Sequence, residues 1–148
     1  MLRAVSATCL ARLSLAGALV SDVNTMTLHL LQPGEGGNAC LDGSPFGYYI
    51  AQNASSNDWI IDIDGGGWCD SAQSCVSRIS ASSRLASSST WAPLGGGSGI
   101  TSGSPEDNPQ YHTYNRVNFP YCDGSSFTSH REQPLVLSLS LSLSVCVC

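Results

Sequence analysis

Short apolar runs separated by turn residues occupy the middle of the chain, and their pattern predicts strands. Residues 26–31 have the alternation of a first strand, and a glycine-rich turn over residues 33–37 follows them. Turn residues at 42–45 precede a strand-like run at 48–51, so these segments predict an N-terminal antiparallel hairpin. The apolar run over residues 59–64 predicts the next strand.

The second half of the chain has weaker patterns. Residues 71–84 contain few glycines or prolines, and their apolar side chains at near-helical spacing predict a weak, serine-rich helix. Residues 87–104 are dominated by serine and glycine and predict a loop, whereas residues 117–121 predict a further short strand. A chain of 148 residues is one domain at most.

The first 20 residues contain no acidic side chain, and a run of mostly small and apolar residues follows Arg3 to about Val20. With Arg3 near the start and a small-x-small pattern at residues 16–18, they predict a secretory signal peptide over residues 1–20. Arg12 interrupts the apolar run, so a mitochondrial-type presequence is the alternative. The sequon at residues 53–55, with Asn53 as the glycosylation candidate, favours secretion to the extracellular space or a cell wall.

The chain ends in a strict two-residue repeat. Leu and Ser alternate from residue 137, and the last four residues alternate Val and Cys. Translated dinucleotide repeats have this form, so we interpret residues 130–148 as a low-complexity tail that arises from intron read-through in the gene model. The alternative is a genuine alternating strand, which has the same period.

The charge of the chain argues against two classes of partner. Its net charge is −5, and all of its basic residues are arginine. An acidic chain without lysine is a poor candidate for binding nucleic acid or an anionic membrane surface. No stretch is long and apolar enough to span a bilayer.

The cysteines favour an oxidising compartment, because the chain has 7 of them. Apart from one in the expected leader and two in the tail, they are Cys40, Cys69, Cys75 and Cys122. By proximity we expect a short bridge between Cys69 and Cys75, which leaves Cys40 and Cys122 as the other pair. The alternative is a zinc site in which His112 joins Cys69, Cys75 and Cys122, but these residues include no C-x-x-C knuckle. Disulfides are therefore favoured, and no metal or other cofactor is expected.

Three consecutive glycines follow the strand predicted at residues 59–64. They leave several backbone N–H groups uncovered by side chains, which suits the stabilisation of negative charge on an oxygen atom. The glycine-rich oxyanion loop of α/β-hydrolase esterases has this arrangement. Trp68 can form one wall of an acyl pocket, and Cys69 can fix the loop through a disulfide bond. The alternative is an ordinary tight turn, in which glycine triplets are common.

Several blocks of the sequence resemble one protein family in their order and spacing. They are C-L-D-G-S-P-F-G-Y-Y at 40–49, W-I-I-D-I-D-G-G-G-W-C at 59–69, S-C-V-S-R at 74–78, G-I-T-S at 99–102, N-P at 108–109, Y-N-R-V at 114–117 and Y-C-D-G-S-S-F at 121–127. In this order they are similar to the N-terminal part of the pectin acetylesterase family, which also contains the Notum carboxylesterases. The resemblance covers roughly residues 39–128.

The resemblance implies an α/β fold, with residues 21–129 as the N-terminal part of an α/β-hydrolase-like domain that is truncated before the nucleophile elbow. It places an oxyanion hole at Gly66, Gly67 and Trp68, with the last two as N–H donors and the Trp68 ring in the substrate pocket. Residues 123–126 resemble a loop at the rim of an active site, and Tyr121 is expected to be structural. Because a few strands leave sheet surface and edges uncovered, the fold is expected to be incomplete and partly disordered on its own.

The nucleophile, base and acid of a serine esterase are absent from the chain. No G-x-S-x-G elbow occurs, and the nearest run, residues 96–99, has Ile100 in place of the last glycine and is expected to be a flexible loop that follows no strand. In the family that the chain resembles, the catalytic residues lie beyond the matching blocks. The histidines of the chain, which match none of those positions, are His29, His112 and His130.

Two functions remain open. The first is a secreted carboxylesterase that deacetylates pectin or another acylated substrate, of which this chain is an inactive fragment. The second is a small, non-catalytic, disulfide-bonded secreted module that binds carbohydrate or a protein partner. A continuation that contains G-x-S-x-G would favour the first function, and a complete chain that folds alone would favour the second.

Overall fold

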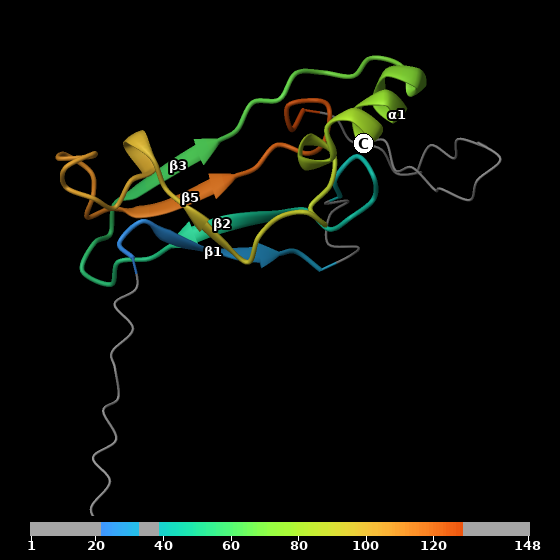
Figure 1. The fold of residues 1–148 in the computed structure, drawn as a ribbon. Coiled ribbons are helices and arrows are strands. Elements are labelled where there is room, and N and C mark those ends of the chain that lie inside the picture. The colour runs from blue at the N-terminus through green and yellow to red at the C-terminus, as the bar shows by residue number, and fades with distance from the viewer. Residues whose placement is uncertain (1–21, 33–38, 129–148) are drawn as a thin grey trace, which may run out of the picture.

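A computed structural model describes residues 22–32 and 39–128, which are the coloured parts of Figure 1. The expected signal peptide, the turn at 33–37 and the tail at 130–148 lie outside these residues.

A mixed five-stranded sheet forms the body of the molecule (Figure 1), with the strand order β3-β5-β2-β1-β4. The strands are β1 (Thr25–Leu30), β2 (Gly47–Ala51), β3 (Trp59–Ile63), β4 (Leu94–Gly96) and β5 (Asn115–Phe119). Strands β1 and β2 pair antiparallel with Leu28 opposite Tyr49, as the hairpin pattern predicted. Strand β3 runs parallel to β5, with Ile61 opposite Val117, so the glycine segment leaves the sheet at the carboxyl end of a parallel strand.

The helix α1 (Ala72–Ala81) follows the glycine segment and lies at that end of the sheet (Figure 1). Its serine-rich sequence has weak helical propensity, and a capping box supports its first turn: Ser71 and Ser74 each accept a hydrogen bond from the other's backbone N–H. The buried face is anchored by Cys75, which packs in a small cluster with Leu41 and Ala86. A short 3-10 helix, η1 (Ser83–Leu85), ends the segment.

The serine- and glycine-rich region at 87–104 was expected to be a loop, and this prediction is wrong in part. It contains β4 and the 3-10 helix η2 (Gly99–Thr101). Strand β4 pairs antiparallel with β1, with Gly95 opposite Met26. A Cβ at Gly95 would lie 2.9 Å from the Tyr49 ring, so only glycine allows β4 to pack against this ring. The same glycine makes the segment resemble a loop in the sequence.

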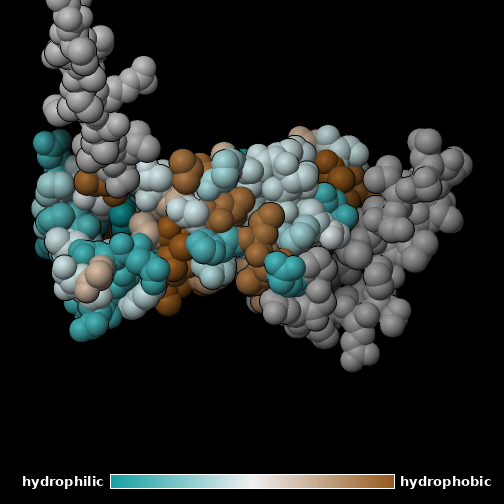
Figure 2. Space-filling view, turned by 90° about the horizontal axis from the view of Figure 1, so that it is seen from below, coloured by the Kyte–Doolittle hydropathy of each residue, from teal (hydrophilic) through white to brown (hydrophobic). Residues whose placement is uncertain are grey.

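Strand β3 is an edge of the sheet in the described part of the chain, and one of its faces is open. Ile60 is only 8% exposed, whereas Trp59, Ile61 and Ile63 are 47%, 65% and 60% exposed. Parallel strands are normally covered on both faces. On the side that Figure 2 shows, seen from below Figure 1, hydrophobic residues gather in the middle of the molecule and hydrophilic residues lie at one end.

Candidate functional site

The glycine segment, residues 64–69, joins β3 to α1 and is fastened at both ends to residues 119–124. The N–H of Asp64 donates to the carbonyl of Phe119 at 3.0 Å, which extends the β3–β5 pairing by one step. The N–H of Cys69 donates to the carbonyl of Gly124, also at 3.0 Å. The glycines therefore span a gap whose two ends are held by the same neighbouring segment.

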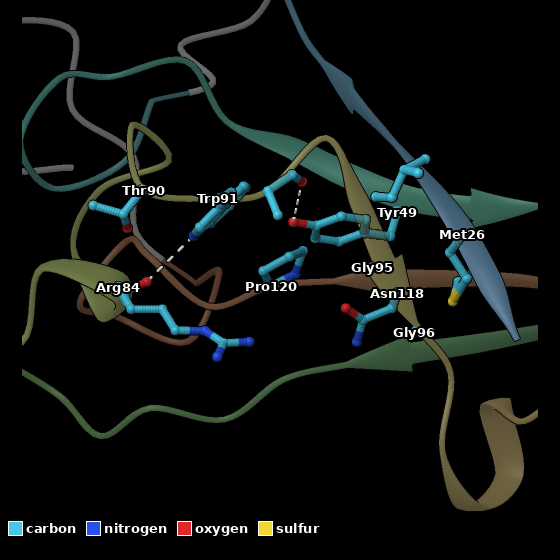
Figure 3. A pocket seen from close by; sticks show the side chains of 11 residues that line it. Met26, Tyr49, Arg84, Thr90, Trp91, Gly95, Gly96, Asn118 and Pro120 are labelled. Atoms are coloured by element: carbon cyan, nitrogen blue, oxygen red, sulfur yellow. Dashed lines mark hydrogen bonds between the residues drawn. The ribbon is translucent and has the colours of Figure 1, made fainter.

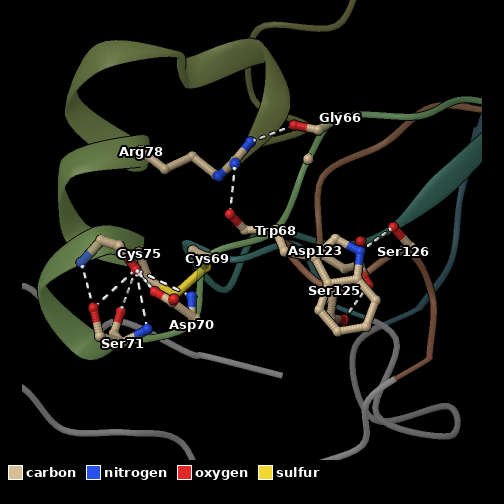
Figure 4. The surroundings of a disulfide bond; sticks show 12 residues. Gly66, Trp68, Cys69, Asp70, Ser71, Cys75, Arg78, Asp123, Ser125 and Ser126 are labelled. Atoms are coloured by element: carbon tan, nitrogen blue, oxygen red, sulfur yellow. Dashed lines mark hydrogen bonds between the residues drawn. A yellow bond between two sulfur atoms is a disulfide. The ribbon is translucent and has the colours of Figure 1, made fainter.

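Side chains bind the carbonyl oxygens of three consecutive residues in this segment. Arg78 of α1 donates from Nη1 to the carbonyl of Gly66 at 2.7 Å and from Nη2 to the carbonyl of Trp68 at 3.1 Å (Figure 4). Between them, the Tyr121 hydroxyl donates to the carbonyl of Gly67 at 2.6 Å. No local pattern in the sequence connects Arg78 with the glycines, and Tyr121 was expected to be structural only.

The backbone N–H groups of Gly66, Gly67 and Trp68 have no hydrogen-bond partner among the described residues. Gly67 and Trp68 are exposed as well, so these donors are accessible to a ligand. Free backbone donors in a segment whose carbonyls are bound elsewhere are what a developing oxyanion requires. The assignment of Gly67 and Trp68 as oxyanion donors stays a prediction.

Two of the three glycines are required by their surroundings. A Cβ at Gly66 would lie 2.0 Å from the ring of Tyr121, and Gly67 has φ +71°, where other residues are strained. A Cβ at Gly65 would meet nothing within 4 Å. Proline at position 67 would impose φ near −65°, so that substitution would distort the loop as well as remove its N–H.

Trp68 contacts Ser126, which belongs to the segment 123–126 that resembles an active-site rim. Its ring is 66% exposed, and its Nε1–H donates to the Ser126 hydroxyl at 2.8 Å (Figure 4). Ser126 and Phe127 both have positive φ, at 55° and 60°, and the Asp123 carboxylate accepts the Phe127 N–H at 2.7 Å. Strained residues of this kind cluster at functional sites. The pocket role of the Trp68 ring stays a prediction.

Both expected disulfides are present. Cys69–Cys75 joins the end of the glycine segment to the first turn of α1 (Figure 4), and Cys40–Cys122 joins residues separated by 82 positions. The first bridge holds α1, and with it Arg78, beside the glycines. The alternative zinc site is excluded, because Cys69, Cys75 and Cys122 are all in disulfide bonds and have no thiolate to bind a metal.

The histidines and Asn53 that the structure describes bind groups outside the glycine segment. His29 stacks on Tyr48, a ring nitrogen of His112 is 3.2 Å from the carbonyl of Asn108, and His130 lies outside the described residues. The side chain of Asn53 donates to the carbonyl of Thr113 at 2.7 Å, and its role as a glycan acceptor stays a prediction.

The G-G-S-G run at 96–99 was expected to follow no strand, and this prediction is wrong, because β4 ends at Gly96. The run is nevertheless no nucleophile elbow. The N–H of Ser98 donates to the Thr101 hydroxyl at 3.1 Å, and the Thr101 hydroxyl donates to the Ser98 carbonyl at 2.9 Å, so Ser98 caps η2.

A cavity of about 270 Å³ lies under β4 and contains no residue of the glycine segment (Figure 3). Its lining includes Tyr49, Arg84, Trp91 and Asn118. The Tyr49 hydroxyl donates to the carbonyl of Ala92 at 2.8 Å. Burial raises the pKa of Tyr49, and the positive charge of Arg84 offsets part of that rise.

Arg116 has a structural role, because its side chain joins β5 to two other segments of the chain. Arg116 is 6% exposed and donates to the carbonyls of Thr101 and Val23 at 2.9 and 2.8 Å. Burial lowers the pKa of Arg116.

Among the described residues, no helix has the length and apolar character needed to cross a membrane.

The chain is similar to several known proteins. The family model described as Pectinacetylesterase matches residues 19–139. The chain is 45% identical over 83 residues to the inactive palmitoleoyl-protein carboxylesterase notum1b of Danio rerio, which covers 56% of this chain and 60% of the relative. It is 42% identical over 83 residues to palmitoleoyl-protein carboxylesterase NOTUM of Mus musculus, covering 56% of this chain and 16% of that protein. It is also 41% identical over 101 residues to pectin acetylesterase 11 of Arabidopsis thaliana, covering 65% of this chain and 25% of that protein.

A solved structure shares the fold. The Wnt deacylase Notum from Drosophila matches with a TM-score of 0.69 and 34% sequence identity, over 75% of this chain and 32% of that chain. The chain therefore spans less than two thirds of the relatives that it matches.

Proposed function

Because the chain belongs to the pectinacetylesterase family, we propose that it supplies the oxyanion side of a secreted carboxylic ester hydrolase. Its sheet and helix are the N-terminal part of an α/β-hydrolase-like fold. The observation that supports the proposal is the glycine segment, in which the N–H groups of Gly67 and Trp68 are free while the neighbouring carbonyls are bound.

The chemistry follows from where charge develops. When a nucleophile attacks an ester, the carbonyl oxygen gains negative charge, and fixed backbone donors stabilise it without first having to reorganise. Removing one such donor typically lowers kcat by about 10²–10³-fold. In this proposal Gly67 and Trp68 are the donors, and the Trp68 ring is a wall of the acyl pocket.

The substrate class in this proposal is an O-acyl ester on a polysaccharide or a protein. The names of the relatives support this range, because one set is called pectin acetylesterase and the other palmitoleoyl-protein carboxylesterase. Secretion is supported by the two disulfides and by the composition of residues 1–20.

We further propose that the 148-residue chain alone has no serine-hydrolase activity. Its sequence contains no G-x-S-x-G motif, so a nucleophile elbow must come from elsewhere. A relative named inactive, notum1b, is also the one of which the chain covers 60%.

Labelling with a fluorophosphonate probe tests the absence of a nucleophile. The purified, oxidised chain should show no labelled serine in peptide mapping and should hydrolyse p-nitrophenyl acetate at the rate of the heat-denatured chain. A complete family esterase treated in the same way is the positive control. Labelling of any serine, with hydrolysis above the denatured control, would refute the proposal.

A further inference from the structure

We propose that Arg78 and Tyr121 are positioning residues of the oxyanion loop, each of which directs one of its two N–H donors. The proposal rests on the proposed oxyanion role of Gly67 and Trp68. It assigns a function to two side chains that donate hydrogen bonds to carbonyl oxygens of the loop.

Arg78 directs the first donor through the geometry of the peptide group. The C=O of Gly66 and the N–H of Gly67 belong to the same planar unit, and in a trans peptide they point in opposite directions. The described residues contain no cis peptide bond. Because Nη1 of Arg78 holds the Gly66 oxygen at 2.7 Å, the N–H of Gly67 must point away from the guanidinium.

Tyr121 directs the second donor in the same way. Its hydroxyl holds the Gly67 oxygen at 2.6 Å, and the N–H that shares this peptide group is that of Trp68. The ring of Tyr121 occupies the space where a side chain at Gly66 would lie, so the loop rests on the ring as well as on the hydroxyl. Tyr121 itself is 1% exposed and has little freedom to move.

The glycine segment needs such a clamp because its own sequence does not fix it. Glycine occupies positive and negative φ with similar ease, so the peptide groups on either side of Gly67 can rotate. A rotated peptide would present its carbonyl oxygen to the substrate and would repel an oxyanion. Binding the carbonyls from behind selects the orientation in which the N–H groups are free.

Arginine suits this role better than lysine would. Its planar guanidinium carries donors in a fixed fork, and here two of them reach the carbonyls of residues 66 and 68 together. A lysine has a single nitrogen and no such fork. Arg78 is itself placed by α1, whose Cys75 is bonded to Cys69 at the end of the same loop.

The test uses the oxidised 148-residue chain, labelled with ¹³C and ¹⁵N. Three variants are compared with the wild type: Arg78→Lys, Tyr121→Phe and, as a matched control, Ser77→Ala on the exposed side of the same helix. The measurements are the carbonyl ¹³C shifts of residues 66–68 and the amide shifts of Gly67 and Trp68 during titration with methylphosphonate.

Each variant should weaken the methylphosphonate response of the N–H donor that the substituted residue directs. Tyr121→Phe keeps the ring but loses the hydroxyl, so the Gly67 carbonyl shift should change and the methylphosphonate response at Trp68 should weaken by about tenfold. Arg78→Lys should change the carbonyls of Gly66 and Trp68 and weaken the response at Gly67. Ser77→Ala should match the wild type throughout. A purely structural role would lower the melting temperature without this residue-by-residue pattern.

Two results separate the clamp from the oxyanion function. If wild-type Gly67 and Trp68 do not respond to methylphosphonate, the proposed oxyanion function fails, while the carbonyl shifts in the variants still decide the clamp. If the carbonyl shifts of residues 66–68 in both Arg78→Lys and Tyr121→Phe equal those of the wild type, the clamp is refuted. The two conservative variants act at different carbonyls, so wild-type carbonyl shifts in one of them, if it folds, refute the positioning role of that residue alone.

Discussion

The hydroxyl of Tyr121 is 2.6 Å from the carbonyl oxygen of Gly67, although 54 positions separate the two residues in the chain. The same tyrosine excludes a side chain from Gly66, where a Cβ would lie 2.0 Å from its ring. One side chain therefore both requires a glycine and orients the peptide group that follows it. The glycine triplet is thus a set of unequal positions rather than a uniform flexible link.

Alanine substitutions should separate these positions. Gly66→Ala should lower the free energy of unfolding by about 1–3 kcal/mol, because the new methyl group overlaps the Tyr121 ring. Gly65→Ala is the matched control and should be close to neutral, since a Cβ there meets nothing within 4 Å. Urea denaturation followed by tryptophan fluorescence measures both variants. Equal destabilisation by the two substitutions would contradict the contact with Tyr121.

The two disulfides should contribute unequally to stability. In the chain-entropy model, the Cys69–Cys75 bridge closes a loop with a separation of 6 residues and stabilises the fold by about 2–3 kcal/mol. The Cys40–Cys122 bridge has a separation of 82 and should stabilise by about 4–5 kcal/mol. The double variants Cys69→Ser/Cys75→Ser and Cys40→Ser/Cys122→Ser, compared in urea denaturation, test this order.

Peptide mapping without reduction provides the check on connectivity. Fragments that contain Cys69 should be linked to fragments that contain Cys75 and to no other cysteine. A Cys69 that is free, or bonded to Cys40 or Cys122, would contradict the described pairing and would remove the support that the bridge gives to Arg78.

The open face of β3 should make the chain self-associate. Ile61→Lys should lower the concentration-dependent mass measured by analytical ultracentrifugation, because Ile61 is 65% exposed in the apolar row that it forms with Trp59 and Ile63, and a charge there opposes association of that face. Leu94→Lys on β4, at the other edge, is the matched control for an exposed apolar residue, at 58%. An effect of Leu94→Lys equal to that of Ile61→Lys would contradict a specific role for β3.

Tyr49 should make stability decrease at alkaline pH. Its pKa is raised in the folded state, chiefly by burial, so the folded chain holds the phenolic proton to higher pH than the unfolded chain. The contribution is complete below the ordinary value of 10.0 and is lost as pH rises through the folded-state pKa. Tyr49→Phe should remove this part of the decrease in the pH dependence of urea denaturation.

The second cause of the Tyr49 shift has its own test. Arg84 lowers the pKa of Tyr49 by its charge, so Arg84→Gln should raise that pKa further, as measured by phenolate absorbance near 295 nm. A lower pKa of Tyr49 in Arg84→Gln would contradict the placement of the two residues around the cavity in Figure 3.

Local features of the sequence were sufficient for several elements. The β1–β2 hairpin and β3 follow from apolar and turn patterns, and α1 follows from the run without glycine or proline. The Cys69–Cys75 pair and the position of the glycine segment were also readable, since both depend on residues close together in the chain. These interactions involve neighbours, so the composition of a short window carries the information.

Only the tertiary structure decided how the glycine segment is oriented. Arg78 and Gly66 are 12 positions apart, and Tyr121 and Gly67 are 54 apart, so no window of sequence contains both partners of these contacts together with their geometry. Strand β4 was hidden for the same reason, because its three residues are held by pairing with β1 rather than by propensity. The glycines indicate that the loop can adopt many conformations. The groups that select one conformation, the Arg78 guanidinium and the Tyr121 hydroxyl, come from other parts of the fold.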